Sequence, residues 1–154
     1  MDEQVCCPPF DPKPWQRKFV SFDHQTFVKV KVRTFSYMPL NFGSVMTKAQ
    51  SQIEAAGAKV VDNIALSNHL SRWTMEVLIA VDTEVPGMKM ITLTGKFLSN
   101  VYEGPFKDTA MWCKDFERFA KEEGFVFSTW YMWYTTCPMC AKKYGKNYVV
   151  ILGQ

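Results

Sequence analysis

Hydrophobic and polar residues alternate from Phe27 to Phe35, a pattern typical of a β-strand with one buried face. One face carries Val28, Val30 and Val32, and the other carries Lys29, Lys31 and Arg33. Pro39 ends this strand. From about Phe42 to Ala56 the apolar residues recur at steps of three and four, which predicts an amphipathic helix. Gly57 lies just after the end of this predicted helix, at a position where glycine is favoured.

The same order of elements then occurs a second time. Strands are expected over residues 59–66 and 73–81, and Pro86-Gly87 is a strong turn signal. The second half predicts a strand over 88–98, a loop over 102–106 and a helix over 108–123 that Asp108 can cap and Gly124 ends. An aromatic strand over 125–136 and a last strand over 147–152 follow. This duplicated βαββ unit predicts an α+β domain with a mainly antiparallel sheet, two helices on one face and pseudo-two-fold symmetry.

The strand around residues 125–134 is aromatic on both faces, which a half-exposed antiparallel strand would not need. One face carries Val126, Ser128, Trp130, Met132 and Tyr134; the other carries Phe125, Phe127, Thr129, Tyr131 and Trp133. Two helices can cover only one face of a sheet. Either Phe10 and Trp15 of the N-terminal segment cover the second face, or it lines a concave pocket, and the two accounts are compatible.

Composition narrows the class of protein. A chain of 154 residues with 47% hydrophobic residues suits one domain with a packed core. We expect residues 1–20, rich in proline and cysteine, to pack on a single domain over 21–154. The sequence has no stretch long and apolar enough for a membrane span, and its start lacks the apolar core of a secretory signal, so a cytoplasmic protein is expected. A net charge of +3 spread over both signs is too weak to imply nucleic acid, and neither nucleic acid nor a membrane is expected as a partner.

Five cysteines leave two interpretations open. Cys137-Pro-Met-Cys140 has the spacing of a zinc knuckle, and Cys6-Cys7 is the other pair that could complete a four-cysteine site. Alternatively, these residues are reduced thiols and the C-x2-C segment is a hairpin. In the first interpretation the zinc is structural, and in neither interpretation is a cofactor required for function. Cys113 is expected to be a small core residue.

Candidate functional residues are carboxylates and aromatics. Glu76 lies in a largely apolar strand and Glu103 in a Tyr-Glu-Gly-Pro turn, so each is a candidate general acid or base; the alternative is a solvated charge. The ligand-binding candidates are Tyr37, Trp73, Tyr102, Trp130, Tyr131 and Trp133. His24 and His69 are far apart in the sequence and have no metal spacing. The motifs of serine hydrolases, phosphate loops and dinucleotide-binding folds are absent from the sequence.

The repeated βαββ order, together with Tyr102, Gly104 and Pro105 before the second helix, resembles the GyrI-like small-molecule-binding domain family. The resemblance covers about Phe27 to Leu152 and implies a fold shared with SOUL haem-binding proteins. It also implies a cleft for amphipathic, aromatic or cationic molecules. Some members are hydrolases that open strained cyclopropane rings with pocket aromatics and a glutamate. The Cys-Pro-x-Cys hairpin departs from the general pattern and suggests a subfamily.

Three function hypotheses follow. The first is a free-standing protein, monomer or weak dimer, that holds an amphipathic or aromatic small molecule in an aromatic-lined cleft. The second is a hydrolase of reactive electrophilic molecules of the cyclopropanoid type, with Glu76 or Glu103 directing water. The third is a protein that binds haem without covalent attachment through His69 or His24, or a zinc-stabilised adaptor.

Overall fold

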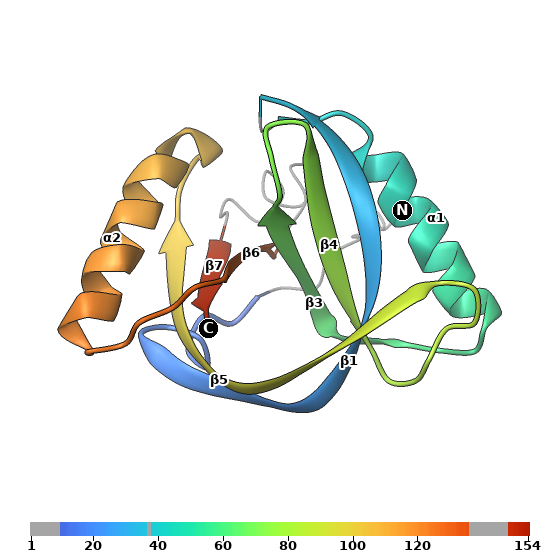
Figure 1. Ribbon diagram of the computed structural model, residues 1–154, viewed down its shortest axis with the longest axis horizontal. Coiled ribbons are helices and arrows are strands. Elements are labelled where there is room, and N and C mark those ends of the chain that lie inside the picture. Colours follow the sequence, from blue (N-terminus) through green and yellow to red (C-terminus); the bar gives the residue numbers. More distant parts are fainter. Residues whose placement is uncertain (1–9, 37, 136–147) are drawn as a thin grey trace, which may run out of the picture. The chain divides into compact units, whose positions relative to one another are not determined.

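The computed structural model describes residues 10–36, 38–135 and 148–154 (Figure 1). The elements in chain order are β1 (Lys18–Phe35), β2 (Met38–Pro39), α1 (Phe42–Ala55), β3 (Val60–His69), β4 (Thr74–Val81), β5 (Lys89–Glu103), the short 3-10 helix η1 (Phe106–Asp108), α2 (Thr109–Glu122), β6 (Trp130–Tyr134) and β7 (Tyr148–Gly153). The strand-helix-strand-strand order thus occurs twice, as the sequence predicted. The predicted α+β class with a mainly antiparallel sheet is confirmed.

The chain divides into two compact units, and the boundaries fall within the long strands β1 and β5. One unit is Phe22–Thr94, in which the strands lie in the order β2-β1-β4-β3 and α1 supplies the helix. The other unit combines the described residues before Phe22 with those from Gly95 onward. Its strands lie in the order β6-β7-β5, and α2 supplies the helix. Each unit therefore has its own helix and its own core.

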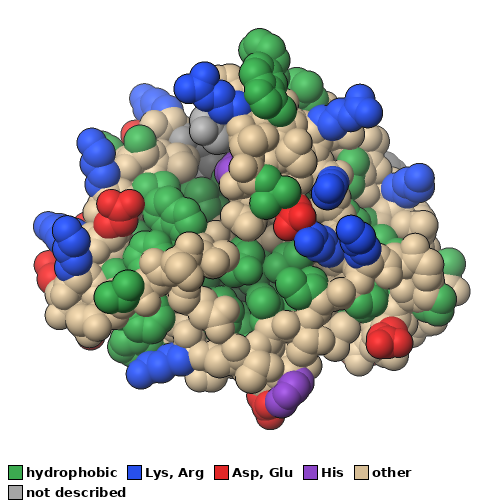
Figure 2. Space-filling model, viewed as in Figure 1, with side chains coloured by type: hydrophobic (Ala, Val, Ile, Leu, Met, Phe, Trp, Pro, Cys, Tyr) green, Lys and Arg blue, Asp and Glu red, His purple; other side chains and the backbone are tan. Residues whose placement is uncertain are grey.

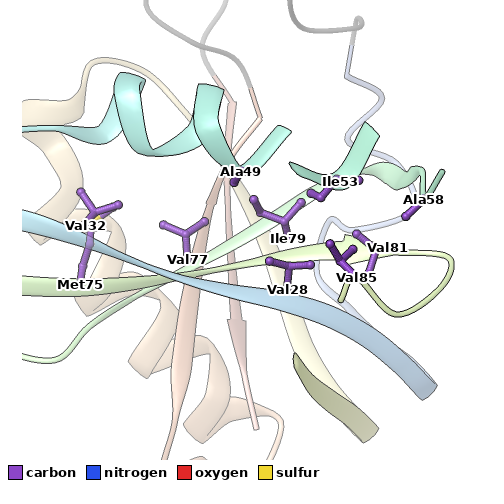
Figure 3. Packing of buried hydrophobic residues seen from close by; sticks show 10 residues of the cluster. All are labelled: Val28, Val32, Ala49, Ile53, Ala58, Met75, Val77, Ile79, Val81 and Val85. Carbon is purple, nitrogen blue, oxygen red and sulfur yellow. The ribbon is translucent and has the colours of Figure 1, made fainter. Parts of the chain in front are cut away.

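The core of the Phe22–Thr94 unit lies between α1 and the strands β1 and β4 (Figure 3). Val28 pairs with Ile79 and Val32 with Met75 across the two strands, and all four side chains are buried. Ala49 and Ile53 of α1 close the cluster, with Ala58, Val77, Val81 and Val85 completing it. The valine face predicted for β1 is the buried one, because only that face lets the lysine and arginine side chains opposite reach water.

Both helices end in the same motif, which confirms the two glycine stops. Gly57 has φ +76° and Gly124 has φ +65°, a left-handed conformation that costs glycine little. Beyond each glycine the next backbone N–H donates back into the helix, from Ala58 to Ile53 O at 3.1 Å and from Phe125 to Ala120 O at 2.9 Å. These bonds satisfy carbonyls that the helix end would otherwise leave open.

Two local expectations were wrong. Residues 125–129 do not belong to a strand, and β6 begins only at Trp130, because Phe125 is bound to the end of α2 and the chain must first leave the helix. Asp108 does occupy the position before α2, but its side chain makes no capping hydrogen bond. Within the described residues, no helix is long and apolar enough to cross a membrane.

Candidate functional site

The sheet β6-β7-β5 has two different faces, and α2 covers one of them. Trp130, Met132 and Tyr134 of β6 lie on the helix side. They pack around Leu98, Val149, Ile151, Trp112, Phe116, Phe119 and Ala120. Phe125 and Phe127 belong to the same cluster, with the Phe127 ring 5.3 Å from that of Phe116. The sequence had placed these two phenylalanines on the opposite face, which is wrong because they precede the strand rather than alternate within it.

The opposite face of β6 carries Tyr131 and Trp133, both buried. Phe10 and Trp15 contact Trp133 edge to face, with ring centroids 5.3 and 5.1 Å away. Phe10 also lies 5.7 Å from the ring of Tyr148 on β7. The N-terminal segment therefore covers at least part of this face, as one of the two interpretations of the sequence proposed. We call these five aromatic residues the covered aromatic face.

The backbone of the N-terminal segment is held in place next to this face. Ser99 Oγ donates to Trp15 O at 2.7 Å, and Arg17 N donates to Asn100 Oδ1 at 3.2 Å. Ser99 and Asn100 are buried polar residues in β5. Sequence reasoning did not single them out, although two polar residues within the apolar stretch Phe97–Val101 were a signal that the strand has polar partners.

The indole N–H of Trp133 is in an unusual environment. Its side chain is 3% exposed, and among the described residues its indole Nε1 is a buried donor without a hydrogen-bond partner. A buried donor left unpaired costs about 1–3 kcal/mol relative to one that finds an acceptor. Buried indole N–H groups usually have a partner, so this atom is a place where an acceptor would bind favourably.

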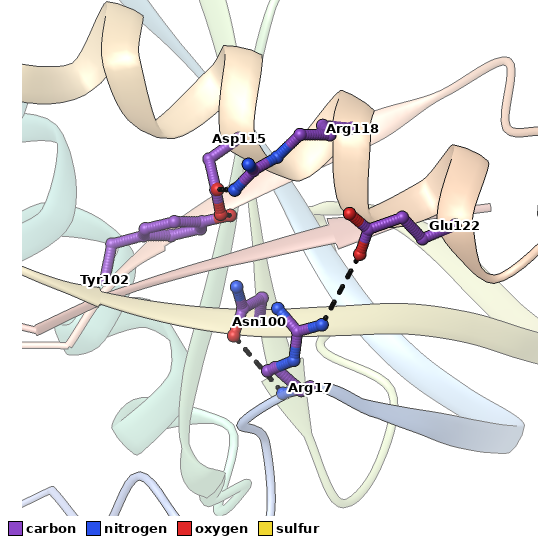
Figure 4. A network of polar contacts seen from close by, with 6 residues as sticks. All are labelled: Arg17, Asn100, Tyr102, Asp115, Arg118 and Glu122. Carbon is purple, nitrogen blue, oxygen red and sulfur yellow. Dashed lines mark hydrogen bonds and ion pairs between the residues drawn. The ribbon is translucent and has the colours of Figure 1, made fainter.

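On the helix side, a polar network joins β5 to α2 (Figure 4). Tyr102 stacks on Trp112 with centroids 6.0 Å apart, and its hydroxyl donates to Asp115 Oδ2 at 2.7 Å. Burial, followed by this hydrogen bond, raises the pKa of Tyr102 above its ordinary range. The same hydrogen bond is the main reason that the pKa of Asp115 is lowered. Arg118, one turn further along α2, also pairs with Asp115.

Arg17 belongs to the same network (Figure 4). Its guanidinium lies 4.3 Å from the centre of the Phe119 ring and 3.7 Å from Glu122 Oε2. Both partners are on α2, so a residue of the N-terminal segment contacts the helix side of this unit, whereas Trp15 contacts the other face. Sequence reasoning did not identify Arg17 or Asp115, since neither lies near Tyr102 in the chain.

The two candidate carboxylates lie in different units and different surroundings. Glu76 on β4 is only 14% exposed and forms an ion pair with Lys29 Nζ at 3.0 Å. Glu103 is exposed at the end of β5, where it is paired across the strands with Tyr148 of the covered aromatic face. Gly104 follows with φ +144°, a conformation that favours glycine, and a Cβ there would meet Trp112 at 3.5 Å.

The other predicted residues are spread over the molecule. Trp73, a ligand-binding candidate that the sequence had placed within the strand over 73–81, lies just before β4 and is exposed. Tyr37, Cys6, Cys7, Cys137 and Cys140 lie outside the described residues. In the part of the chain that the structure describes, no cluster of His, Cys, Asp and Glu could hold a metal ion.

Burial also shifts the pKa of two side chains outside this network. His69 is half-buried, which lowers its pKa, and exposed His24 pairs with Asp23 at 2.8 Å. Burial raises the pKa of the Cys113 thiol. Figure 2 shows basic and acidic side chains interspersed on one face of the molecule, with hydrophobic side chains exposed between them.

Solved structures with this fold include a DNA-bound protein and a hydrolase. The EcmrR C-terminal domain has a TM-score of 0.67 at 10% identity, covering 90% of this chain and 96% of that one. EcmrR in its DNA complex has a TM-score of 0.65 at 9% identity, covering 90% of this chain and 56% of that one. A hydrolase from Listeria innocua has a TM-score of 0.58 at 12% identity, covering 90% and 92%. These likenesses fit the GyrI-like fold predicted from the sequence.

The expectation that nucleic acid is not a partner was wrong. The fold occurs in EcmrR bound to DNA, so the small net charge of +3 on this chain does not exclude association with DNA. The charge argument failed because a domain can be part of a longer chain whose other parts contact DNA, and this chain covers only 56% of the EcmrR chain in that complex.

A search of curated proteins found no match to this sequence. A family model described as "Bacterial hydrolase", in contrast, matches residues 1–154. The match extends over the whole sequence, including both βαββ units and the N-terminal segment. The chain therefore belongs to the bacterial hydrolase family.

Proposed function

We propose that the protein binds an aromatic or amphipathic small molecule at the covered aromatic face, through a hydrogen bond from Trp133. The indole N–H of Trp133 carries this proposal, because it is a buried donor that has no partner among the described residues. An acceptor atom on a ligand would remove the penalty of leaving it unpaired. The ligand therefore combines a flat apolar body with an oxygen or nitrogen acceptor.

The surroundings of Trp133 favour a flat ligand. Tyr131, Tyr148, Phe10 and Trp15 present ring faces and edges, which suit offset or edge-to-face contacts with an aromatic guest. Besides these ring contacts, the segment of Phe10 and Trp15 is held by the hydrogen bonds of Trp15 O and Arg17 N and by the ion pair of Arg17. A guest that reaches Nε1 would take the place of one of these rings, and the segment would close over it.

The test of this proposal observes the indole N–H signal of Trp133 by NMR. In a ¹H–¹⁵N spectrum the five tryptophans give indole signals, and that of Trp133 is the one missing in Trp133→Phe. We would titrate 2-acetylnaphthalene, which has a carbonyl acceptor, and 2-ethylnaphthalene, which has nearly the same shape without it. We expect the ketone to move the Trp133 signal and to bind ~5–150-fold more tightly, the equivalent of about 1–3 kcal/mol.

Matched variants complete the test. Trp133→Phe should remove the preference for the ketone, whereas Trp130→Phe, on the helix side of the same strand, should keep it. Equal binding of the two naphthalenes by the wild-type protein would refute the hydrogen bond. Binding of neither compound, with an unmoved Trp133 signal, would refute the site itself.

A second candidate function is hydrolysis of a reactive electrophile of the cyclopropanoid type at the same face. Membership of the bacterial hydrolase family favours it, as does the fold shared with the Listeria hydrolase. Two observations support Glu103 over Glu76 as the residue that directs water. Glu103 is exposed and lies across from Tyr148, whereas Glu76 is already paired with Lys29.

The test of catalysis compares variants on a cyclopropane-bearing alkylating agent. Glu103→Gln should lower kcat by roughly 10²–10⁴-fold, the usual contribution of a general acid or base. Glu76→Gln, which removes a charge of the same sign from the other unit, should leave kcat within a few-fold. A Glu103→Gln variant that is as active as wild type, or a loss of activity confined to Glu76→Gln, would reject this assignment.

A further inference from the structure

Two neighbouring hairpin tips lie at one end of the Phe22–Thr94 unit. One follows β1 and leads into β2, and the other joins β3 to β4 (Figure 1). Thr34 links them, because its N–H donates to Trp73 O at 2.8 Å and its hydroxyl donates to Arg72 O at 2.7 Å. The two tips therefore form one surface, although residues about 40 positions apart build it.

This surface gathers most of the exposed large hydrophobic side chains of the described residues. Phe35, Leu40, Leu70 and Trp73 are 61%, 66%, 50% and 56% exposed, and they are four of the seven such side chains in the described ranges. The rings of Phe35 and Trp73 contact each other, with centroids 5.5 Å apart. Single exposed apolar residues are ordinary, but a cluster of this kind usually marks an interaction site.

The backbone of the tips is largely paired within the protein. The N–H groups of Leu70 and Ser71 both donate to Thr74 O, and that of Trp73 donates to Ser71 Oγ. The N–H of Leu40 donates back to β1 at 2.9 Å. These groups therefore lose little when the tips leave water, since a backbone donor without a partner is expensive only in an apolar medium.

The charges around the tips are positive. Arg33 and Arg72 are exposed, and in the described part of the chain neither forms an ion pair. Glu76, further along β4, is already paired with Lys29. The surface therefore combines aromatic and aliphatic side chains with two exposed cationic ones, and it is complementary to a partner that is anionic outside and apolar within.

We propose that this aromatic–basic tip, made of Phe35, Leu40, Leu70 and Trp73 with Arg33 and Arg72, docks on the surface of an anionic lipid bilayer. The side chains protrude from two hairpin tips rather than line a groove, and a fluid interface can receive a protrusion without a preformed hollow. Tryptophan and arginine suit the headgroup level, and the leucines reach the acyl chains. Nucleic acid offers no comparable partner for exposed leucines. The absence of a membrane-spanning helix among the described residues does not bear on a contact of this kind.

Co-sedimentation of the full chain with vesicles tests the proposal. We expect binding to vesicles of phosphatidylcholine with phosphatidylglycerol, weaker binding to phosphatidylcholine alone, and weakening by salt. Each of Arg33→Gln and Arg72→Gln should weaken binding roughly fivefold, since a basic residue near such a surface contributes about 1 kcal/mol. Trp73→Ala should weaken it by roughly tenfold, as expected for losing an apolar side chain of which about half is available to the lipid.

Control variants distinguish binding through the aromatic–basic tip from non-specific hydrophobic binding to vesicles. Met111→Ser and Val126→Ser remove exposed apolar side chains that lie outside the tip, 62% and 94% exposed, and should bind vesicles like wild type. Trp73→Phe should still bind but lose the quenching of tryptophan fluorescence by brominated acyl chains.

Four outcomes would overturn the proposal. These are no binding to the anionic vesicles, equal losses in the control variants, Trp73-dependent self-association without vesicle binding, and Trp73-dependent binding of an oligonucleotide in preference to vesicles.

Discussion

Replacing Tyr102 with phenylalanine removes one hydroxyl and keeps the ring that stacks on Trp112. The lost interaction is the hydrogen bond to Asp115, which joins the end of β5 to α2. A hydrogen bond to a charged group contributes ~1.5–3 kcal/mol. The Asp115 side chain is 32% exposed, so water weakens the bond. We therefore expect the variant to be less stable by about 1.5 kcal/mol at neutral pH.

The pH dependence of this difference tests its cause. The pKa of Asp115 is lowered in the folded protein, so its contribution is complete above the unfolded carboxyl value and is lost as the pH falls through the lowered one. The pKa of Tyr102 is raised, so its contribution is complete below the ordinary tyrosine value of about 10 and is lost at higher pH. The difference between wild type and Tyr102→Phe should be greatest near neutrality and shrink at both extremes.

Urea denaturation from acid to alkaline pH measures this difference. Tyr148→Phe is the matched control, because it removes a tyrosine hydroxyl from the other face of the same sheet; we expect a change below ~0.5 kcal/mol. A Tyr102→Phe variant as stable as wild type at neutral pH would refute the reasoning, as would a difference that does not vary with pH. If stability is kept but binding of the naphthalene ketone is lost, Tyr102 belongs to the ligand site instead.

Three further predictions follow from packing and from the cysteines. Gly153→Ala should destabilise the protein by ~1–3 kcal/mol, because its Cβ would meet the rings of Phe127 and Phe116 at 3.0 and 3.1 Å; thermal unfolding measures this, and an unchanged midpoint would contradict it. Gly43→Ala should instead stabilise it by up to ~1 kcal/mol, because the residue is in α1 and, apart from its own helix, no described residue comes within 4 Å of an added Cβ; a lower midpoint would show that this helix needs glycine there. Elemental analysis of reduced protein purified without added metal should find about one zinc per chain if the four-cysteine site forms, and protein without zinc would leave the cysteines as thiols. That prediction concerns Cys6, Cys7, Cys137 and Cys140.

Much of the fold could be predicted because its signals are local. The alternation of β1 identifies its buried face from residues two apart, and Gly57 and Gly124 identify helix ends from the need for a left-handed backbone. The limits of the strands were less accurate. β1 begins at Lys18 and β5 runs to Glu103, well beyond the segments expected from alternation, because pairing with neighbouring strands extends a strand past its own pattern.

For the candidate site, the sequence pointed to individual residues but not to the contacts that they make. The aromatic strand pointed to Tyr131 and Trp133, and Phe10 was considered as a cover. The pairing of Glu76 with Lys29 was not predicted, although the two belong to neighbouring strands. The polar partners of β5 were also not predicted, since sequence alternation says which face a residue occupies but not what lies against it.

The sequence by itself determined the order of elements, the ends of the helices and the inward face of β1, because each depends on residues a few positions apart. Only the tertiary structure decided what surrounds Trp133 and Tyr102. Trp133 meets residues more than a hundred positions earlier, and Tyr102 meets Asp115 through the packing of a helix on a sheet. Chemistry at these places arises from long-range contacts, and burial makes the difference between a satisfied and an unsatisfied polar group matter.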